Sequence, residues 1–272
     1  MDSGWRLFLR TIVARAYPRV IGQQRQKSWI FFETFLPFLA VAGYVYVYRA
    51  MEASQDFIGF AVMGGAMTAF WLNVIWSMSA QMYWEKDNGN LALYIMAPNS
   101  MMAILLGMAL GGMVATALRA AVILVIGIWV FHVEFAVSSL TQLFAVFLLT
   151  LSALYGMGML FASLFLLYGR NVWQINTMLQ DPIYLISGFY FPVKNFGMAV
   201  SLAASILPMT LGMDAMRQLL FSSGSAIGFL PVRTEIIGLV ILSVVFVTAA
   251  KYWLEKVERL AVLEGTLTDR RK

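Results

Sequence analysis

Six long apolar stretches decide what this chain can fold into. They lie at residues 29–48, 57–80, 101–131, 140–167, 175–191 and 235–253. Each approaches or exceeds the roughly 20 residues that a helix needs to cross the hydrocarbon core of a bilayer. Only 12% of the residues are charged, too few to cover the surface of a water-soluble globule. We therefore predict an all-α integral membrane protein in which residues 1–272 form a single domain with six transmembrane helices.

The stretch before the last span, residues 192–233, is apolar but is interrupted by residues that break helices. These are Pro192, Gly197, Pro208, Gly212 and Pro231. Irregular backbone at membrane depth is tolerated where the chain is covered by protein or turns at the interface. We predict short helices here that dip into the membrane and return, forming a re-entrant outer segment.

The basic residues predict the orientation, because cytoplasmic loops carry an excess of Lys and Arg. With the N-terminus inside, fourteen of the 19 basic residues fall on the cytoplasmic side and four on the outer side. We therefore predict a multi-pass protein of the cytoplasmic (inner) cell membrane with both termini in the cytoplasm.

Residues 1–28 combine recurrent arginines with an apolar stripe at helical spacing. The stripe consists of Trp5, Leu9, Ile12, Val13, Ala16 and Val20. A helix of this kind lies in the plane of the membrane interface, and Pro18 should kink or end it. Two interpretations remain open: a basic leader that sets the topology, or a connecting helix that lies on the inner leaflet.

The composition excludes several kinds of chemistry. Cysteine is absent and His132 is the single histidine, so neither thiolate sites nor two-histidine metal motifs can exist. No Gly-Lys dipeptide occurs in the sequence, and a Walker A motif requires one. We expect no catalytic residue, no cofactor, no metal and no ATPase site in this chain.

The longest polar interruption on the predicted cytoplasmic side lies at residues 81–100. Its charged residues cannot remain in hydrocarbon, so the chain must surface there. Gly89 can end a short helix, and Pro98 ends the following amphipathic turn. The pattern predicts a short charged helix, parallel to the membrane, that a cytoplasmic partner can grip. Its contact residues would be Glu85, Lys86, Asp87, Gly89, Leu91 and Pro98.

A second informative stretch follows the fifth span. Gly188 and Pro192 allow the chain to turn within the outer interface, and Pro208 marks another turn. Asp214 and Arg217 are three residues apart, so they can share a helix face and neutralise each other.

Together these two stretches resemble the permease subunits of the ABC-2 exporter family. Their inner pattern appears here as Glu85-Lys86, Gly89-Asn90-Leu91-Ala92 and Pro98-Asn99-Ser100. Their outer pattern appears as Ser187-Gly188, Phe191-Pro192, Pro208 and Asp214-x-x-Arg217. Ala92 stands where these permeases usually carry Glu, and Gly197 stands where a second proline usually falls.

The resemblance implies a transport subunit that moves a drug, a lipid or a lipid-linked glycan outward. Residues 81–100 would dock on a separate ATP-binding subunit, present in two copies, which binds ATP and Mg. Two permeases, identical or related, would pair so that spans one, two and five line a central path. An ion- or proton-coupled carrier is the main alternative, and a lipid-modifying enzyme is weaker because Glu85 and Asp87 have no nearby histidine.

Several residues inside the spans are candidates for the translocation path. Arg119 follows a row of small residues at four-residue intervals, typical of a helix-packing seam. It either binds an anionic head group or anchors neighbouring helices. Asn73, Ser77 and Gln81 form a polar row that lines the path or joins helices. The aromatic candidates are Phe70, Tyr184, Phe189 and Tyr190, although such side chains more often pack than bind substrate.

Glu33 is the obvious ionic partner for Arg119, but the expected depths argue against that pairing. Counted along upright helices from Trp29 and Trp129, the two residues differ in depth by roughly 9 Å. We therefore expect Glu33 to contact Arg25, Lys27 or the coupling region at residues 81–100.

Overall fold

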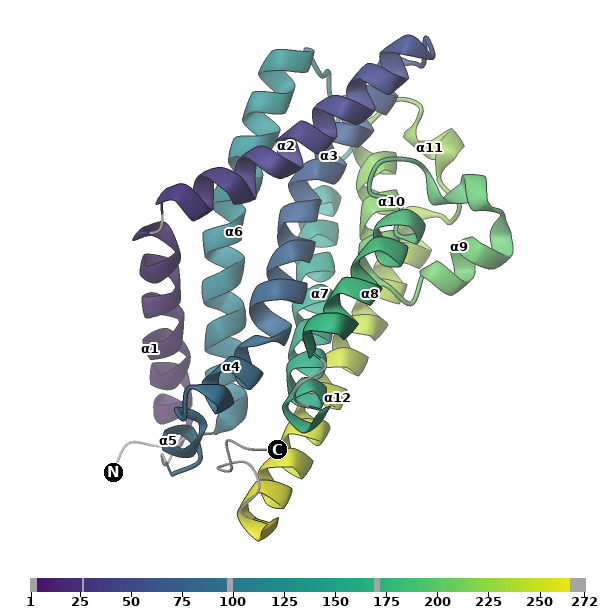
Figure 1. Ribbon diagram of the computed structural model, residues 1–272. Helices are drawn as coiled ribbons and strands as arrows, with labels where there is room; N and C mark the ends of the chain where they lie inside the picture. The colour runs from purple at the N-terminus through teal and green to yellow at the C-terminus, as the bar shows by residue number, and fades with distance from the viewer. Residues whose placement is uncertain (1–3, 26, 97–99, 169–171, 265–272) are drawn as a thin grey trace.

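The computed structural model describes residues 4–25, 27–96, 100–168 and 172–264. All regular structure in these ranges is helical, which confirms the predicted all-α class. Five of the described helical segments are long and apolar enough to cross a membrane, or up to six if one bent pair counts as a span. The start of α1, the short helices α4 and α5 and the end of α12 gather at the lower end of the molecule in Figure 1.

The first half of the chain forms α1 (Gly4–Arg25), α2 (Lys27–Ala50), α3 (Gln55–Leu72), the π-helix η1 (Asn73–Ser79), α4 (Gln81–Asp87), α5 (Leu91–Met96) and α6 (Met101–Phe131). The second half forms α7 (Leu140–Tyr168), α8 (Val172–Ile186), the 3-10 helix η3 (Val193–Phe196), α9 (Met198–Ala204), α10 (Pro208–Leu220), α11 (Gly224–Ile227) and α12 (Val232–Glu264).

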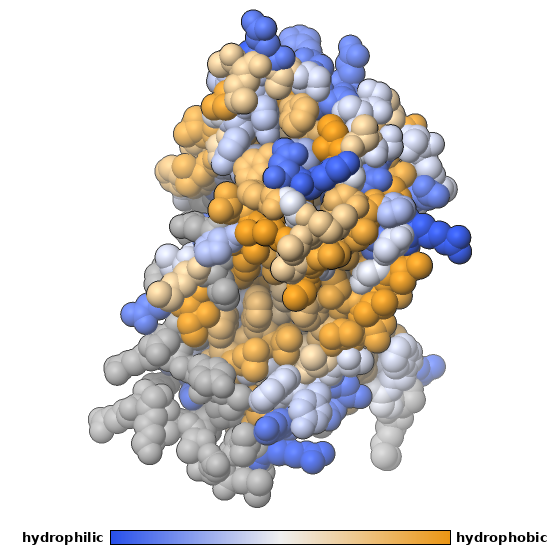
Figure 2. Space-filling model, turned by 90° about the vertical axis from the view of Figure 1, so that its right-hand side faces the viewer, coloured by the Kyte–Doolittle hydropathy of each residue, from blue (hydrophilic) through white to orange (hydrophobic). Residues whose placement is uncertain are grey.

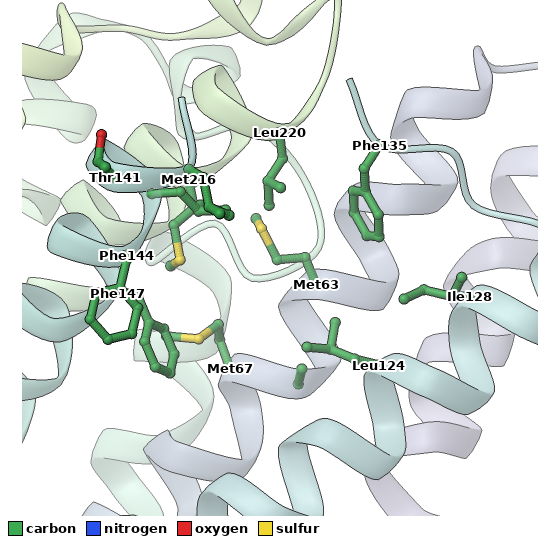
Figure 3. Close-up of a pocket in the computed structure, with 13 residues that line it drawn as sticks. Met63, Met67, Leu124, Ile128, Phe135, Thr141, Phe144, Phe147, Met216 and Leu220 are labelled. Carbon is green, nitrogen blue, oxygen red and sulfur yellow. The ribbon is translucent and has the colours of Figure 1, made fainter. Parts of the chain in front are cut away.

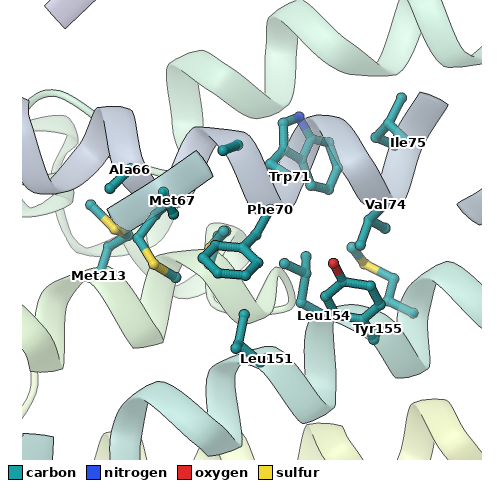
Figure 4. Close-up of a cluster of buried hydrophobic side chains, with 14 of the residues drawn as sticks. Ala66, Met67, Phe70, Trp71, Val74, Ile75, Leu151, Leu154, Tyr155 and Met213 are labelled. Atoms are coloured by element: carbon teal, nitrogen blue, oxygen red, sulfur yellow. The ribbon is translucent and has the colours of Figure 1, made fainter. Parts of the chain in front are cut away.

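The segment α3–η1–α4 is the central span, and 94% of its most apolar window is buried. Small residues allow this close packing: a methyl group added to Gly64 would overlap the carbonyl oxygen of Phe189. Figure 4 shows Phe70, Trp71 and Val74 from this span beside Leu151 and other residues of the buried core. The centre of the molecule is therefore a dry interface between packed helices.

The outer surface is apolar where a membrane would surround it. Figure 2 shows an apolar band across the middle of one face, with hydrophilic residues toward both ends. On α12 the exposed apolar residues include Ile237, Val240, Ile241, Val244 and Val245. Such a band would aggregate in water and is stable in hydrocarbon.

The fifth predicted span differs from the structure. Helix α8 has 15 residues and ends at Ile186, which is short of a membrane crossing. The possible sixth span is instead the pair α9 and α10, which meet at a bend of 114°. This bent pair agrees with the short helices predicted for residues 192–233, and Pro208 begins α10.

Helix α1 stands beside α6, whereas the sequence predicted a helix lying flat on the inner leaflet (Figure 1). Gly107 and Gly111 of α6 make this possible, because a β-carbon on either would crowd the backbone of α1 at Ile12 or Ala16. The predicted small-residue seam is thus confirmed, and α1 is the helix that packs on it. The helix also continues past Pro18 to Arg25, so it does not end at the proline.

Candidate functional site

The coupling region, residues 81–96 of the described chain, ends its first helix at Gly89 as predicted. Gly89 has a φ of 77°, a conformation that residues with a β-carbon rarely adopt. The Gly89 amide donates to the Lys86 carbonyl and the Asn90 amide donates to the Glu85 carbonyl. This pair of bonds is a Schellman motif, and it turns the chain sharply from α4 into α5.

Glu85 of α4 points into the protein, where three side chains donate hydrogen bonds to its carboxylate. The donors are Arg15 of α1 at 3.3 Å, Gln81 at 3.0 Å and Asn90 at 2.9 Å. Arg15 also donates to the Tyr94 hydroxyl, and its guanidinium lies 4.5 Å from the centre of the Tyr94 ring. These contacts join α1, α4 and α5 into one unit.

Arg19, one turn after Arg15, extends the same set of contacts. It donates to Gln81 Oε1 at 2.9 Å and to the Ser77 hydroxyl. Burial lowers the pKa of Arg19 to about 10, so the side chain stays charged at neutral pH. We call the set Arg15, Arg19, Ser77, Gln81, Glu85, Asn90 and Tyr94 the arginine network.

The residues predicted to touch a cytoplasmic partner divide into buried and exposed ones. Glu85 and Leu91 are buried, Lys86 and Gly89 are half-buried, and Asp87 is exposed. Pro98 lies outside the described residues. The exposed apolar side chains of this region are instead Trp84, Leu93 and Met96.

The outer motif is built around Arg217 of α10. This fully buried guanidinium donates to the carbonyl oxygens of Gly188 at 2.5 Å, Phe189 at 3.0 Å and Phe191 at 3.2 Å. Gly188 has a φ of 71°, which turns these carbonyls toward the arginine. Pro192 then precedes η3.

The charge of Asp214 attracts that of Arg217, in agreement with the predicted neutralisation, and Asp214 also forms hydrogen bonds of its own. Its carboxylate accepts hydrogen bonds from Gln218 at 3.0 Å and from the Phe229 amide at 3.0 Å. Gln218 also donates to Glu235 of α12 at 3.1 Å. The sequence analysis did not identify Gln218 and Glu235. The spacing of Asp214 and Gln218, four residues apart on one helix face, could have indicated the contact between these two.

The sequence of this chain matches a known family. A model of the family described as ABC-2 type transporter matches residues 8–221, which is well over half of the chain. This chain belongs to the ABC-2 type transporter family. It is therefore a membrane permease of an ABC transporter. A search of curated proteins found no match.

The polar row on the central span of the ABC-2 permease joins helices. Asn73 accepts a hydrogen bond from the buried Tyr155 hydroxyl of α7 at 3.0 Å, and Ser77 and Gln81 bind Arg19. Phe70 is buried and packs edge-on against Phe147. These contacts agree with the helix-joining interpretation of the row, and a role in the path stays a prediction.

The aromatic candidates after α8 lie next to one another. Phe189 is fully buried and contacts Tyr184, with ring centres 5.1 Å apart. Tyr190 stacks on Tyr44 of α2 at 4.0 Å, and its carbonyl accepts a hydrogen bond from the Tyr48 hydroxyl at 2.6 Å. The contacts of Tyr190 join α2 to the turn after α8. That these aromatic side chains contact substrate stays a prediction.

The expected separation of Glu33 and Arg119 is wrong, since the two side chains form an ion pair. Because α1 rises beside α6, α2 begins partway up the molecule and then runs obliquely across α6 (Figure 1). Depth counted from Trp29 along an upright helix therefore does not apply. Arg119 also donates to the Thr116 hydroxyl at 3.2 Å, so it faces protein, as the seam predicted.

The cavities between the described helices of the permease include the following two. The larger, about 620 Å³, lies between α3, α6, α7 and α10 and is almost entirely apolar (Figure 3). The smaller, about 430 Å³, lies between α2 and α6 and includes Arg119 in its lining. Among the path candidates, Arg119 therefore borders the smaller cavity.

Proposed function

We propose that this permease is the membrane subunit of an ATP-driven exporter. It moves an amphipathic drug, lipid or lipid-linked glycan outward across the cytoplasmic membrane. Separate ATP-binding subunits, two per complex, bind ATP and Mg, and two permeases pair around the path. The chain itself then contributes no catalytic group.

The observation that carries this proposal is the construction of the coupling region. Trp84, Leu93 and Met96 are exposed on short helices at the lower end of the molecule in Figure 1, one of its two hydrophilic ends in Figure 2. Apolar side chains on a polar end are typical of a protein interface. Membership of the ABC-2 family implies a soluble ATP-binding subunit as the partner for this surface.

The arginine network supplies the mechanical link. A displacement of α4 and α5 would be transmitted to α1, because Arg15 and Arg19 form hydrogen bonds between these helices. Helix α1 packs along α6, and α4 continues the central span. Movement of the docked subunit is thereby passed to two membrane-crossing segments.

The test is transport by the complex reconstituted in vesicles. Leu93→Ser removes an exposed apolar contact from the coupling region, and Leu202→Ser removes a similarly exposed leucine from α9, toward the other end of the molecule. We expect Leu93→Ser to lower both transport and transport-linked ATP hydrolysis by about tenfold, the effect of losing one important interface side chain. Leu202→Ser should leave both unchanged.

Two outcomes contradict the proposal. Equal transport activity of both variants would show that the coupling region is not part of the interface with the ATP-binding subunit. Uptake or efflux driven by an ion gradient, without nucleotide or partner, would favour the ion- or proton-coupled carrier.

A further inference from the structure

The smaller cavity forms a wedge between α2 and α6. Its walls are aromatic and aliphatic: Phe31, Phe35 and Phe38 from α2 face Leu118, Val122 and Ile126 from α6. Most of these side chains are exposed, so the wedge opens at the surface of the protein, where membrane would surround it. We call this space the α2–α6 wedge.

Polar groups converge at this otherwise apolar site. Arg119, only 8% exposed, lines the wedge together with Thr34 and Gln24. The guanidinium is paired with Glu33, whose side chain is 33% exposed. Glu33 and the carboxylate of an incoming acid can exchange when that acid transfers its proton to Glu33. The new carboxylate then pairs with Arg119 and Glu33 becomes neutral, so that no charge is left unpaired.

We propose that the α2–α6 wedge binds a single-chain amphipathic organic anion, whose acidic group replaces Glu33 at Arg119 while its apolar body lies along the phenylalanines. Charge complementarity selects the anion, since a neutral apolar molecule gains nothing from Arg119. The site lies between the first and third membrane helices. It is a property of the permease alone and does not depend on coupling to ATP.

The volume agrees with this occupant. About 430 Å³ lies within the range of small-molecule pockets, which combine apolar walls with a few placed polar groups. Phe31, Phe35, Leu118, Val122 and Ile126 are exposed, so an alkyl chain can continue from the wedge into the surrounding lipid.

Binding is measured with purified permease in nanodiscs of neutral phosphatidylcholine. The probe is a dansyl-labelled fatty acid, and its methyl ester serves as the uncharged control. The fatty acid should bind saturably with a rise in dansyl fluorescence, and the ester should bind at least about tenfold more weakly, the usual worth of one charge-assisted contact.

Two charge variants distinguish a ligand site from a structural ion pair. Arg119→Gln should weaken fatty-acid binding by about tenfold or more. Glu33→Gln removes the competing carboxylate and should strengthen binding by about threefold to tenfold. If the pair were only structural, both variants would change binding in the same direction or not at all.

A steric pair keeps the test decisive if a charge variant fails to fold. Val122→Trp fills the wedge, and Val125→Trp places the same side chain on an exposed face of α6 outside it. We expect Val122→Trp to abolish binding and Val125→Trp to retain it, with both proteins monodisperse.

Several results would overturn the proposal. One is equal binding of the acid and the ester, which indicates an ordinary lipid groove. Another is unchanged binding in Val122→Trp. A third is a lower oligomeric mass of Val122→Trp, without charge-dependent probe binding, which assigns the wedge to a second permease copy.

Discussion

At the residue scale, the charges of the coupling region are divided between the interior and the surface. Glu85 and Asp87 are two residues apart, yet Glu85 is buried in the arginine network and Asp87 is exposed. A carboxylate with three donors contributes to stability, because its removal leaves those donors without their partner. An exposed carboxylate contributes little.

This contrast predicts different stabilities for two matched variants. Glu85→Ala should destabilise the permease by about 1.5–3 kcal/mol, the usual worth of hydrogen bonds to a charged group. Asp87→Ala should change stability by less than about 0.5 kcal/mol. The melting temperature in detergent, followed by tryptophan fluorescence, measures both. Equal melting temperatures would mean that the arginine network does not hold the coupling region.

The position of this region could be predicted from the sequence, but the contacts of its residues within the chain could not. Polarity shows that residues 81–100 leave the hydrocarbon, and Gly89 shows where a helix ends. Neither signal says whether Glu85 meets solvent, a partner or Arg15. One further signal was available: Ser77, Gln81 and Glu85 are spaced four apart, as are Arg15 and Arg19, which is typical of two facing helix stripes.

At the element scale, hydropathy predicted which segments are helices but not how they cross. The ranges of α2, α6 and α7 agree closely with three of the predicted spans, and α12 contains a fourth but continues 11 residues past its predicted end. The tilt of α2 comes from its packing and from the rise of α1, and apolar length alone does not fix a tilt. For this reason the ion pair of Glu33 and Arg119 was missed.

The close approach of α3 to the turn after α8 gives a prediction at the same scale. Gly64→Ala would place a methyl group against the Phe189 carbonyl and should destabilise the fold by about 1–3 kcal/mol. Gly43→Ala, in the middle of α2, meets open space and should be neutral or stabilising by up to about 1 kcal/mol. Detergent melting curves compare the two, and a stable Gly64→Ala protein would contradict the tight contact.

At the scale of the whole molecule, the fold class could be predicted from the sequence, whereas the arrangement of the helices could not. The spans that contain α2 and α3 have nearly the same hydropathy, yet the most apolar window is 17% buried in one and 94% in the other. In a membrane, lipid and protein are equally apolar neighbours, so hydropathy cannot tell a central helix from a peripheral one. Small residues do carry that information, as the glycines of α3 show.

The last prediction concerns the orientation of the molecule, and the absence of cysteine makes it directly measurable. Asp87→Cys and Lys256→Cys place single thiols at exposed positions near one end, and Ser225→Cys places one in α11 toward the other (Figure 1). With the basic residues inside, a membrane-impermeant maleimide should label only Ser225→Cys in spheroplasts, and all three after permeabilisation. The cysteine-free parent gives the background. Labelling of Asp87→Cys in intact spheroplasts would show that the topology is the reverse of the predicted one. The coupling region would then lie on the outer side, where no cytoplasmic ATP-binding subunit can reach it.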